Sequence, residues 1–233
     1  MISKVFAVIK EFLRTHKHVW LFLYTLVYLA GFELLEARNG VEYNIIHTPL
    51  DDRIPFNEIF IIPYFLWFAY IAFVLIRLCI KSRNDFIKSF IYIFGGMTIG
   101  LIIFALFPTA QELRPAVMPR ENILAKLTFF LYSIDTPTNV CPSLHVYVAI
   151  GAYIGIRRGE TYFTKAERIS AFILTVAICL ATMFLKQHSV FDVVTGIIMS
   201  FIMYFIIYIP NYSCFSENAK DGNTDITDKA VFK

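Results

Sequence analysis

The feature that most constrains this chain is a series of apolar runs, each close to the length a helix needs to cross a bilayer. A span takes roughly 20 mostly apolar residues, because each residue of a helix advances only about 1.5 Å. The whole chain is 58% hydrophobic and only 17% charged, so lipid rather than water is its main solvent. Six runs predict an all-α, polytopic membrane protein with six transmembrane helices, at residues 18–35, 56–80, 86–107, 142–156, 169–185 and 188–209.

The segments between these runs complete the predicted organisation. Residues 123–134 are apolar but too short to span and include Lys126, so they predict an interfacial helix in the outward loop between the third and fourth spans. Pro142 is expected in the first turn of the fourth helix, where a missing N–H costs nothing, and Pro210 ends the sixth. We expect residues 1–17 to form an amphipathic cytoplasmic segment, 18–210 a single membrane domain and 211–233 a polar, disordered cytoplasmic tail.

The distribution of basic residues predicts the orientation. Cytoplasmic loops carry an excess of Lys and Arg. Six spans put both termini on one side, and most of the 21 Lys and Arg residues fall on that side. The opposite side holds Arg38, Arg53, Arg114, Arg120, Lys126 and Lys186. Both termini are therefore predicted to be cytoplasmic, and the loops at 36–55, 108–141 and 186–188 to face outward.

Charge and cysteine content exclude other classes. The net charge is only +3 and no basic run forms a patch, so nucleic acid is not an expected partner. The four cysteines form no Cys-x-x-Cys pair and predict packing residues rather than a zinc ribbon or disulfide framework.

Three outward segments, 107–115, 141–146 and 185–192, carry polar residues that a lipid-embedded structure does not need. His188 and Asp192 are four apart on the predicted sixth helix, close enough for the carboxylate to orient the imidazole. His145 lies near the N-terminus of the fourth helix, where free N–H groups favour an anion. Two histidines, one carboxylate and nearby donors indicate phosphoryl transfer, with one histidine as nucleophile and the other as general acid. The expected phosphate ligands are Arg114, Ser143 and Lys186.

Each of these residues also has a simpler interpretation. A single histidine or aspartate near a helix end is often only interfacial. Lys186 and Arg114 would serve equally as snorkelling anchors, and Ser143 as a helix N-cap. A metal site built on the two histidines and Asp192 is a further alternative, against which the adjacent cations argue.

The combined motifs resemble the type 2 phosphatidic acid phosphatase (PAP2) superfamily. Pro-Ser-Leu-His at 142–145 and Lys-Gln-His-x-x-x-Asp at 186–192 are similar to its second and third signatures, and Arg114-Pro115 to the end of the first. Residues 135–145 and 182–188 look most like the branch that includes inositol phosphorylceramide synthases. A weaker upstream likeness covers Asp52-Arg-Ile-Pro-Phe56 with Tyr64 and Trp67.

The resemblance implies a six-helix fold and metal-independent chemistry without a cofactor. By position, His188 would form a phosphohistidine, Asp192 would orient it and His145 would protonate the departing alkoxide. Arg114 and Ser143 would hold phosphate oxygens. The chain departs from the pattern at Phe107, Leu144 and Ala181-Thr182, which removes two cations. Lys186 is a candidate to restore one of them.

Three functions follow as hypotheses. The first is a lipid phosphate phosphatase that hydrolyses a phosphomonoester or pyrophosphate at the outer face. The second is a phosphotransferase that moves a phospho-head group to a lipid or polyol hydroxyl, and the third is a non-enzymatic scaffold. Asp135, Asn139 and Gln111 are possible headgroup contacts, although Asp135-Thr-Pro would also suit a simple turn. The expected partners are membrane lipids, and the expected location is a plasma membrane. The residue usage of the chain is compatible with a bacterial source.

Overall fold

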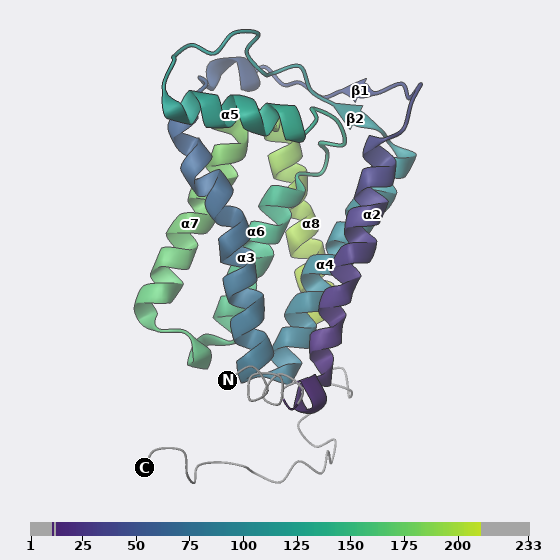
Figure 1. The fold of residues 1–233 in the computed structure, drawn as a ribbon, viewed down its shortest axis with the longest axis vertical. Coiled ribbons are helices and arrows are strands. Elements are labelled where there is room, and N and C mark those ends of the chain that lie inside the picture. The colour runs from purple at the N-terminus through teal and green to yellow at the C-terminus, as the bar shows by residue number, and fades with distance from the viewer. Residues whose placement is uncertain (1–10, 12, 211–233) are drawn as a thin grey trace, which may run out of the picture.

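The computed structural model describes residue 11 and residues 13–210. The expected tail at 211–233 lies outside the described residues, as does most of the expected amphipathic segment at 1–17. In the described part the chain is an upright bundle of helices with one further helix lying across its upper end (Figure 1).

Seven α-helices make up most of the described chain, and short 3₁₀ turns and two short strands join them. The helices are α2 (Tyr24–Glu36), α3 (Ile61–Lys81), α4 (Arg83–Leu106), α5 (Ile123–Ile134), α6 (Leu144–Arg158), α7 (Lys165–Phe184) and α8 (Val190–Tyr208). The 3₁₀ turns are η1 (Lys17–Leu23), η2 (Asp51–Arg53), η3 (Glu58–Phe60) and η4 (Glu160–Tyr162). The strands β1 (Asn44–Ile45) and β2 (Thr109–Ala110) pair in parallel.

Five helical segments of the described chain are long and apolar enough to cross a membrane. They are Lys17–Glu36, Glu58–Lys81, Arg83–Leu106, Lys165–Phe184 and Val190–Tyr208. Their outward faces carry many exposed large apolar side chains, including Leu26, Phe68 and Phe201. Such a surface would be costly in water and suits a lipid environment. The prediction of a mainly helical membrane protein with several apolar spans is therefore confirmed.

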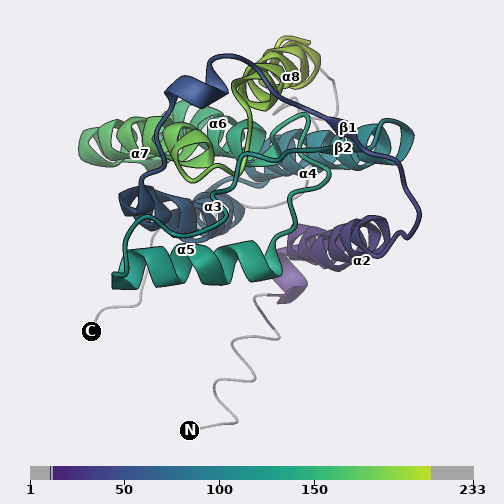
Figure 2. The same ribbon diagram turned by 90° about the horizontal axis from the view of Figure 1, so that it is seen from above.

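The central helix of the bundle, α6, is the exception in length. It has 15 residues, which at the usual rise gives about 22 Å against a hydrocarbon core of about 30 Å. It packs against α3, α4, α7 and α8. Seen from above, α6 lies in the same row as α4 and α7, with α3 and α8 on either side (Figure 2).

Helix starts follow capping side chains in the sequence. Ser82 caps α4, Asn122 caps α5, and Thr164 forms a capping box with Glu167 at the start of α7. The predicted start of the fourth span was wrong by two residues, because Ser143 is the N-cap of α6 and Pro142 lies before it. The predicted start of the sixth was wrong in the same way, because Ser189 caps α8 and the helix begins at Val190.

Close packing between α4 and α6 sets the core. Tyr92 and Tyr147 are fully buried and their rings stack at 5.3 Å. Tyr147 reaches α4 at Gly96, where a Cβ would lie 2.0 Å from the phenol oxygen. Only glycine permits this approach, so the contact fixes α6 against α4 near its N-terminal half.

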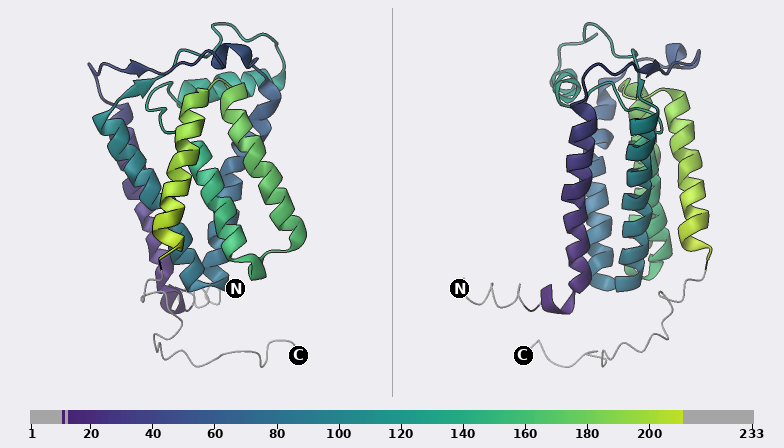
Figure 3. Two further views of the ribbon diagram at one scale, coloured as in Figure 1. Left: turned by 180° about the vertical axis from the view of Figure 1, so that it is seen from behind. Right: turned by 90° about the vertical axis from the view of Figure 1, so that its right-hand side faces the viewer.

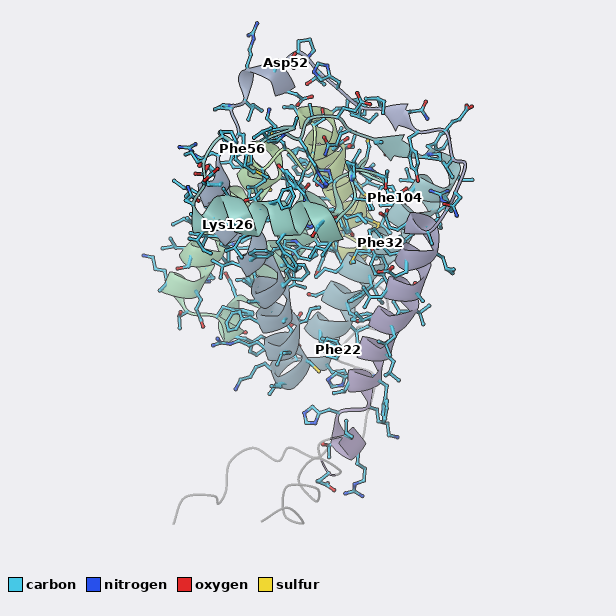
Figure 4. The ribbon with its side chains drawn as sticks, turned by 45° about the horizontal axis from the view of Figure 1, so that its top comes forward. Phe22, Phe32, Asp52, Phe56, Phe104 and Lys126 are labelled. Atoms are coloured by element: carbon cyan, nitrogen blue, oxygen red, sulfur yellow. The ribbon has the colours of Figure 1, made fainter. Side chains whose placement is uncertain are left out.

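The upper end of the bundle is covered by α5 and by the loop of residues 37–57, both visible from behind and from the side in Figure 3. The amphipathic helix α5 matches the predicted interfacial segment in its bounds. Figure 4 shows Lys126 on this helix and Asp52 on the loop above it. The loop is held by β1, which pairs with β2 just after α4. No strands were predicted here.

Candidate active site

Two histidines meet beneath this cover. His145 stands in the first turn of α6 and His188 in the short connection between α7 and α8. The Nδ1 atom of His145 lies 3.4 Å from Nε2 of His188, and the ring centroids are 5.6 Å apart. His188 is only 8% exposed. The structure thus brings together the two residues on which the phosphoryl-transfer hypothesis depends.

A buried carboxylate stands behind His188. The Oδ2 atom of Asp192 is 3.5 Å from Nδ1 of His188 and also accepts a hydrogen bond from the Ser189 N–H at 2.9 Å. The other oxygen of Asp192 and Nδ1 of His188 have no hydrogen-bond partner among the described residues. The two residues were expected on one face of a helix. Instead His188 precedes α8, and the capping turn brings it to Asp192.

The other histidine is held by two aromatic residues of α3. The phenol oxygen of Tyr64 lies 2.9 Å from Nε2 of His145, and Trp67 donates its indole N–H to the His145 carbonyl at 3.1 Å. Tyr64 and Trp67 are three apart, so they share one face of α3. The weak upstream likeness noted in the sequence therefore falls on residues that contact the site.

Asp135 extends the hydrogen-bond chain that runs from His145 through Tyr64. Its Oδ2 accepts hydrogen bonds from Tyr64 at 3.1 Å and from the Gln187 amide at 2.8 Å. Burial raises the pKa of the Asp135 carboxyl, although the charges of His188 and Arg114 oppose that shift. A carboxyl whose pKa is raised by burial and which contacts a histidine-bound phenol is a candidate partner for proton exchange with that phenol.

Arg114 organises the loop around this carboxyl. Its guanidinium donates to the carbonyls of Tyr132 and Asp135 and to the side-chain oxygen of Gln187, at 3.2, 2.7 and 2.6 Å. Burial lowers the pKa of Arg114, yet arginine stays protonated in proteins. Of the three guanidinium nitrogens, only Nε is buried without a hydrogen-bond partner among the described residues. Phosphate binding by Arg114 remains a prediction, with this one donor free.

Lys186 occupies a strained position beside the histidine. Its φ of 54° lies in the left-handed region, so α7 does not continue through it. Its ammonium donates to the carbonyl of Asp51 at 2.7 Å. Burial lowers the pKa of Lys186, against the attraction of Asp51 and Asp52. The lysine thus anchors the loop of residues 37–57, called the covering loop below. Its contact with a phosphate stays a prediction.

Asp51 is the main residue that sequence reasoning missed. It is 2% exposed and accepts hydrogen bonds from the Ser189 hydroxyl at 2.6 Å and the Val190 N–H at 2.8 Å. Burial alone would raise the pKa of Asp51, but these bonds and two from Thr48 hold it below its usual value. The carboxylate therefore fixes the start of α8 directly after His188. The signal in the sequence was the Thr-x-x-Asp pattern at 48–51.

The remaining predicted residues support the framework. Ser143 is fully buried, its hydroxyl accepts from the Val146 N–H at 3.5 Å, and its own N–H donates to the Asp192 carbonyl at 3.0 Å. Gln111 is buried and donates to the Lys186 carbonyl at 3.0 Å. The buried amide of Asn139 bonds to Glu36 and Arg38. Headgroup contact by Gln111 or Asn139 stays a prediction, since each amide already has protein partners.

Comparison of the chain with family models, with curated proteins and with solved structures finds no match. Within the described residues no group of three or more His, Cys, Asp or Glu side chains is placed to hold a metal ion. The chemistry of the site is therefore argued from its geometry.

Proposed function

We propose that this chain is a membrane-integrated lipid phosphate phosphatase of the PAP2 type, acting through a phosphohistidine. The observation that carries the proposal is that the two histidines have different hydrogen-bonding surroundings. His188 has a carboxylate at Nδ1 and its other nitrogen directed at His145. His145 in turn has a phenol at its own outer nitrogen. This is the arrangement that an oriented nucleophile facing a proton donor needs.

The proposed first step transfers the phosphoryl group to His188. With its Nδ1–H directed at Asp192, the lone pair on Nε2 attacks phosphorus and the bond from phosphorus to the lipid oxygen breaks. The leaving alkoxide takes a proton from His145. In the second step His145 accepts a proton from water, the water oxygen attacks phosphorus, and the bond from phosphorus to Nε2 breaks to release inorganic phosphate. Atoms and charge balance without a cofactor.

Substrate must separate the two imidazoles. Their facing nitrogens are 3.4 Å apart, which leaves no room for a phosphorus atom and its three oxygens. The Nε–H of Arg114 is a buried donor without a partner and is available to an anion. A tetrahedral phosphate that pushes the rings apart would gain this donor and both histidines.

The topology proposed for this function has six spans. The sixth span is α6, which adds to the five long apolar helical segments and packs against α3, α4, α7 and α8. Before α6, residues 140–143 are non-helical and mostly buried, and the Thr109 hydroxyl accepts the N–H groups of Val140 and Cys141. Non-helical backbone is tolerated at membrane depth where protein buries it. With both termini cytoplasmic, the histidines lie at the outer face and the lipid tails leave sideways between helices.

A second candidate is a phosphotransferase, in which a lipid or polyol hydroxyl replaces water in the second step. The burial of His188 favours transfer, because a sheltered phosphoenzyme would meet less water. The first step is the same in both.

The test uses the purified protein and a lipid phosphate labelled on phosphorus, with and without candidate alcohols. Release of labelled inorganic phosphate supports hydrolysis, whereas a new labelled lipid supports transfer. An acid-labile label on the protein is expected in wild type and absent in His188→Ala. Full activity of His188→Ala, or loss of wild-type activity in EDTA, would exclude the proposed mechanism.

A further inference from the structure

A second candidate site lies at the end of the bundle opposite the histidines, in a cavity that combines a mainly apolar surface with three basic residues. A cavity of about 430 Å³ opens between the last turns of α6 and the first turns of α7. In Figure 1 this is the lower end of the two helices, far from α5. The residues that line the cavity are Tyr153, Arg157, Lys165, Arg168, Ile169 and Phe172.

Three cations converge on this cavity, and they are not balanced by acids. Arg168 is paired with Glu160 at 2.9 Å. Arg157 and Lys165 are exposed and have no ion-pair partner among the described residues. Glu167 on the same turn is occupied by Arg77. The cavity therefore keeps an excess of two positive charges.

Helix stability does not account for this placement. A cation in the last turn of α6 suits the helix dipole, which explains Arg157 in part. Lys165, however, is the first residue of α7, where the dipole disfavours a positive charge. The neighbouring Arg158 is directed elsewhere, onto the rings of Tyr204 and Tyr208 at 5.0 and 5.4 Å. The excess of Lys and Arg expected in cytoplasmic loops accounts for positive charge at this end of the bundle, but not for two unpaired cations that line one cavity. Their shared cavity points to a ligand with the opposite charge.

The walls of the cavity are apolar on the side that faces lipid. Ile169 and Phe172 are 51% and 53% exposed, and both lie on the outer face of α7. Tyr153 packs against Phe172 with ring centroids 5.6 Å apart. A ligand held by the cations would therefore have an exposed apolar surface directly beside it, as an acyl chain requires.

We propose that this cavity binds the phosphate headgroup of an anionic phospholipid, with its acyl chains along Ile169 and Phe172. Basic pockets between membrane helices recognise such headgroups through charge and through the adjacent apolar surface. The site is separate from the histidine pair, so the inference does not depend on the proposed function. The lipid is a structural ligand of the α6–α7 connection rather than a substrate.

The test measures lipid retention by native mass spectrometry of the full chain in a nonionic detergent. Phosphatidylglycerol and phosphatidylcholine with identical acyl chains are offered at equal concentration. The test variant is Arg157→Gln with Lys165→Gln. The matched control is Lys17→Gln with Lys81→Gln, which removes the same charge from the same end of the bundle but outside the cavity.

Wild type and the control are expected to retain one phosphatidylglycerol in preference to phosphatidylcholine. The test variant should bind phosphatidylglycerol roughly tenfold to thirtyfold more weakly, since each surface cation contributes separately. Its melting temperature without lipid should match wild type, which shows that it folds. Equal retention of the two lipids, or an equal loss in the control, would overturn the proposal. Displacement of the lipid by inorganic phosphate at the same concentration would identify a soluble-anion site instead.

Discussion

The phenol oxygen of Tyr64 lies 2.9 Å from Nε2 of His145, and the same oxygen lies 3.1 Å from the carboxylate of Asp135. The hydroxyl therefore connects the proposed proton donor to a carboxyl whose pKa is raised by burial. If Tyr64 donates to Asp135, then His145 must donate to Tyr64. If Asp135 is protonated and donates to the Tyr64 oxygen, Tyr64 donates to Nε2 of His145, so both of these bonds reverse. The pair thus lets His145 change its protonation without exposure to water.

Tyr64→Phe removes this connection and leaves the ring in place. We expect the phosphatase rate to fall by about 10- to 100-fold, at the lower end of general acid–base contributions. Tyr70→Phe is the matched control, because Tyr70 lies on the same helix as Tyr64 and its hydroxyl bonds to Thr175 of α7, away from the histidines. The control should keep its rate and lose about 1 kcal/mol of stability. Equal rates in both variants would remove Tyr64 from the mechanism.

Asp192→Asn tests the carboxylate behind His188. Asparagine can still accept the Ser189 N–H, so the cap of α8 remains, but the charge facing the imidazole is lost. By analogy with other oriented imidazoles we expect a rate loss on the order of 10³- to 10⁴-fold with little change in melting temperature. The control is Asp85→Asn, since Asp85 occupies the same position after the N-cap Ser82 of α4. Activity near wild type in Asp192→Asn would contradict the assignment of His188 as nucleophile.

Much of the helical framework was predictable from local patterns. The interfacial helix α5 follows from an apolar stretch too short to span. The start of α6 was predicted too early because proline is favoured in the first helical turn, whereas the alternative interpretation of Ser143 as an N-cap is confirmed. The start of α8 was predicted too early because Ser189 was not considered as an N-cap. That error matters for the site, since His188 lies in the turn before a helix and not on it.

The site itself was predictable only in part. His145, His188 and Asp192 were found because they lie in recognisable segments at helix ends. Asp51 was not, because it reaches Ser189 across 138 positions of sequence from the short 3₁₀ turn η2 in the loop of residues 37–57. The contact between Tyr64 and Asp135 likewise spans 71 positions. Such long-range contacts are fixed by tertiary packing, and the periodicity and spacing of residues along the sequence do not predict them.

Asp51→Asn tests how the covering loop positions the histidine. The carboxylate accepts bonds from Ser189, Val190 and Thr48, and an amide can satisfy only some of these donors. We expect a loss of about 1–3 kcal/mol in stability and a lower rate, because the segment after His188 loosens. Asp52→Asn, on the exposed neighbour paired with His47, should change neither. A variant as stable and active as wild type would show that the loop does not hold α8.

The same residue predicts an acid limit. The folded pKa of Asp51 is depressed, so its contribution to stability is fully present above the unfolded value near 3.8 and is lost as pH falls through the folded pKa. Wild type should therefore lose melting temperature more steeply than Asp51→Asn as the pH drops below about 4. Parallel curves for the two proteins would contradict this assignment. The measurement is thermal unfolding in detergent at a series of acidic pH values.

Gly196→Ala tests the close approach of α8 to the start of α6. A Cβ at Gly196 would lie 2.6 Å from the backbone carbonyl oxygen of Ser143, which cannot move freely because the Ser143 N–H bonds to the Asp192 carbonyl. The methyl group must push the two helices apart, and with them His145 and Asp192. We expect a loss of about 1–3 kcal/mol in stability and a fall in rate.

Gly95→Ala is the control for that change. A Cβ at Gly95 would be in ordinary van der Waals contact with the flexible end of Met203 at 3.7 Å and with Ile91 at 4.0 Å, so alanine fits. Its better helix propensity should leave stability equal or up to about 1 kcal/mol higher. Both variants are compared by thermal unfolding and by phosphate release. If Gly196→Ala melts and turns over like Gly95→Ala, the spacing of α6 and α8 does not govern the histidine site. If Gly196→Ala loses rate while melting near wild type, that spacing acts directly on the alignment of His145 with His188.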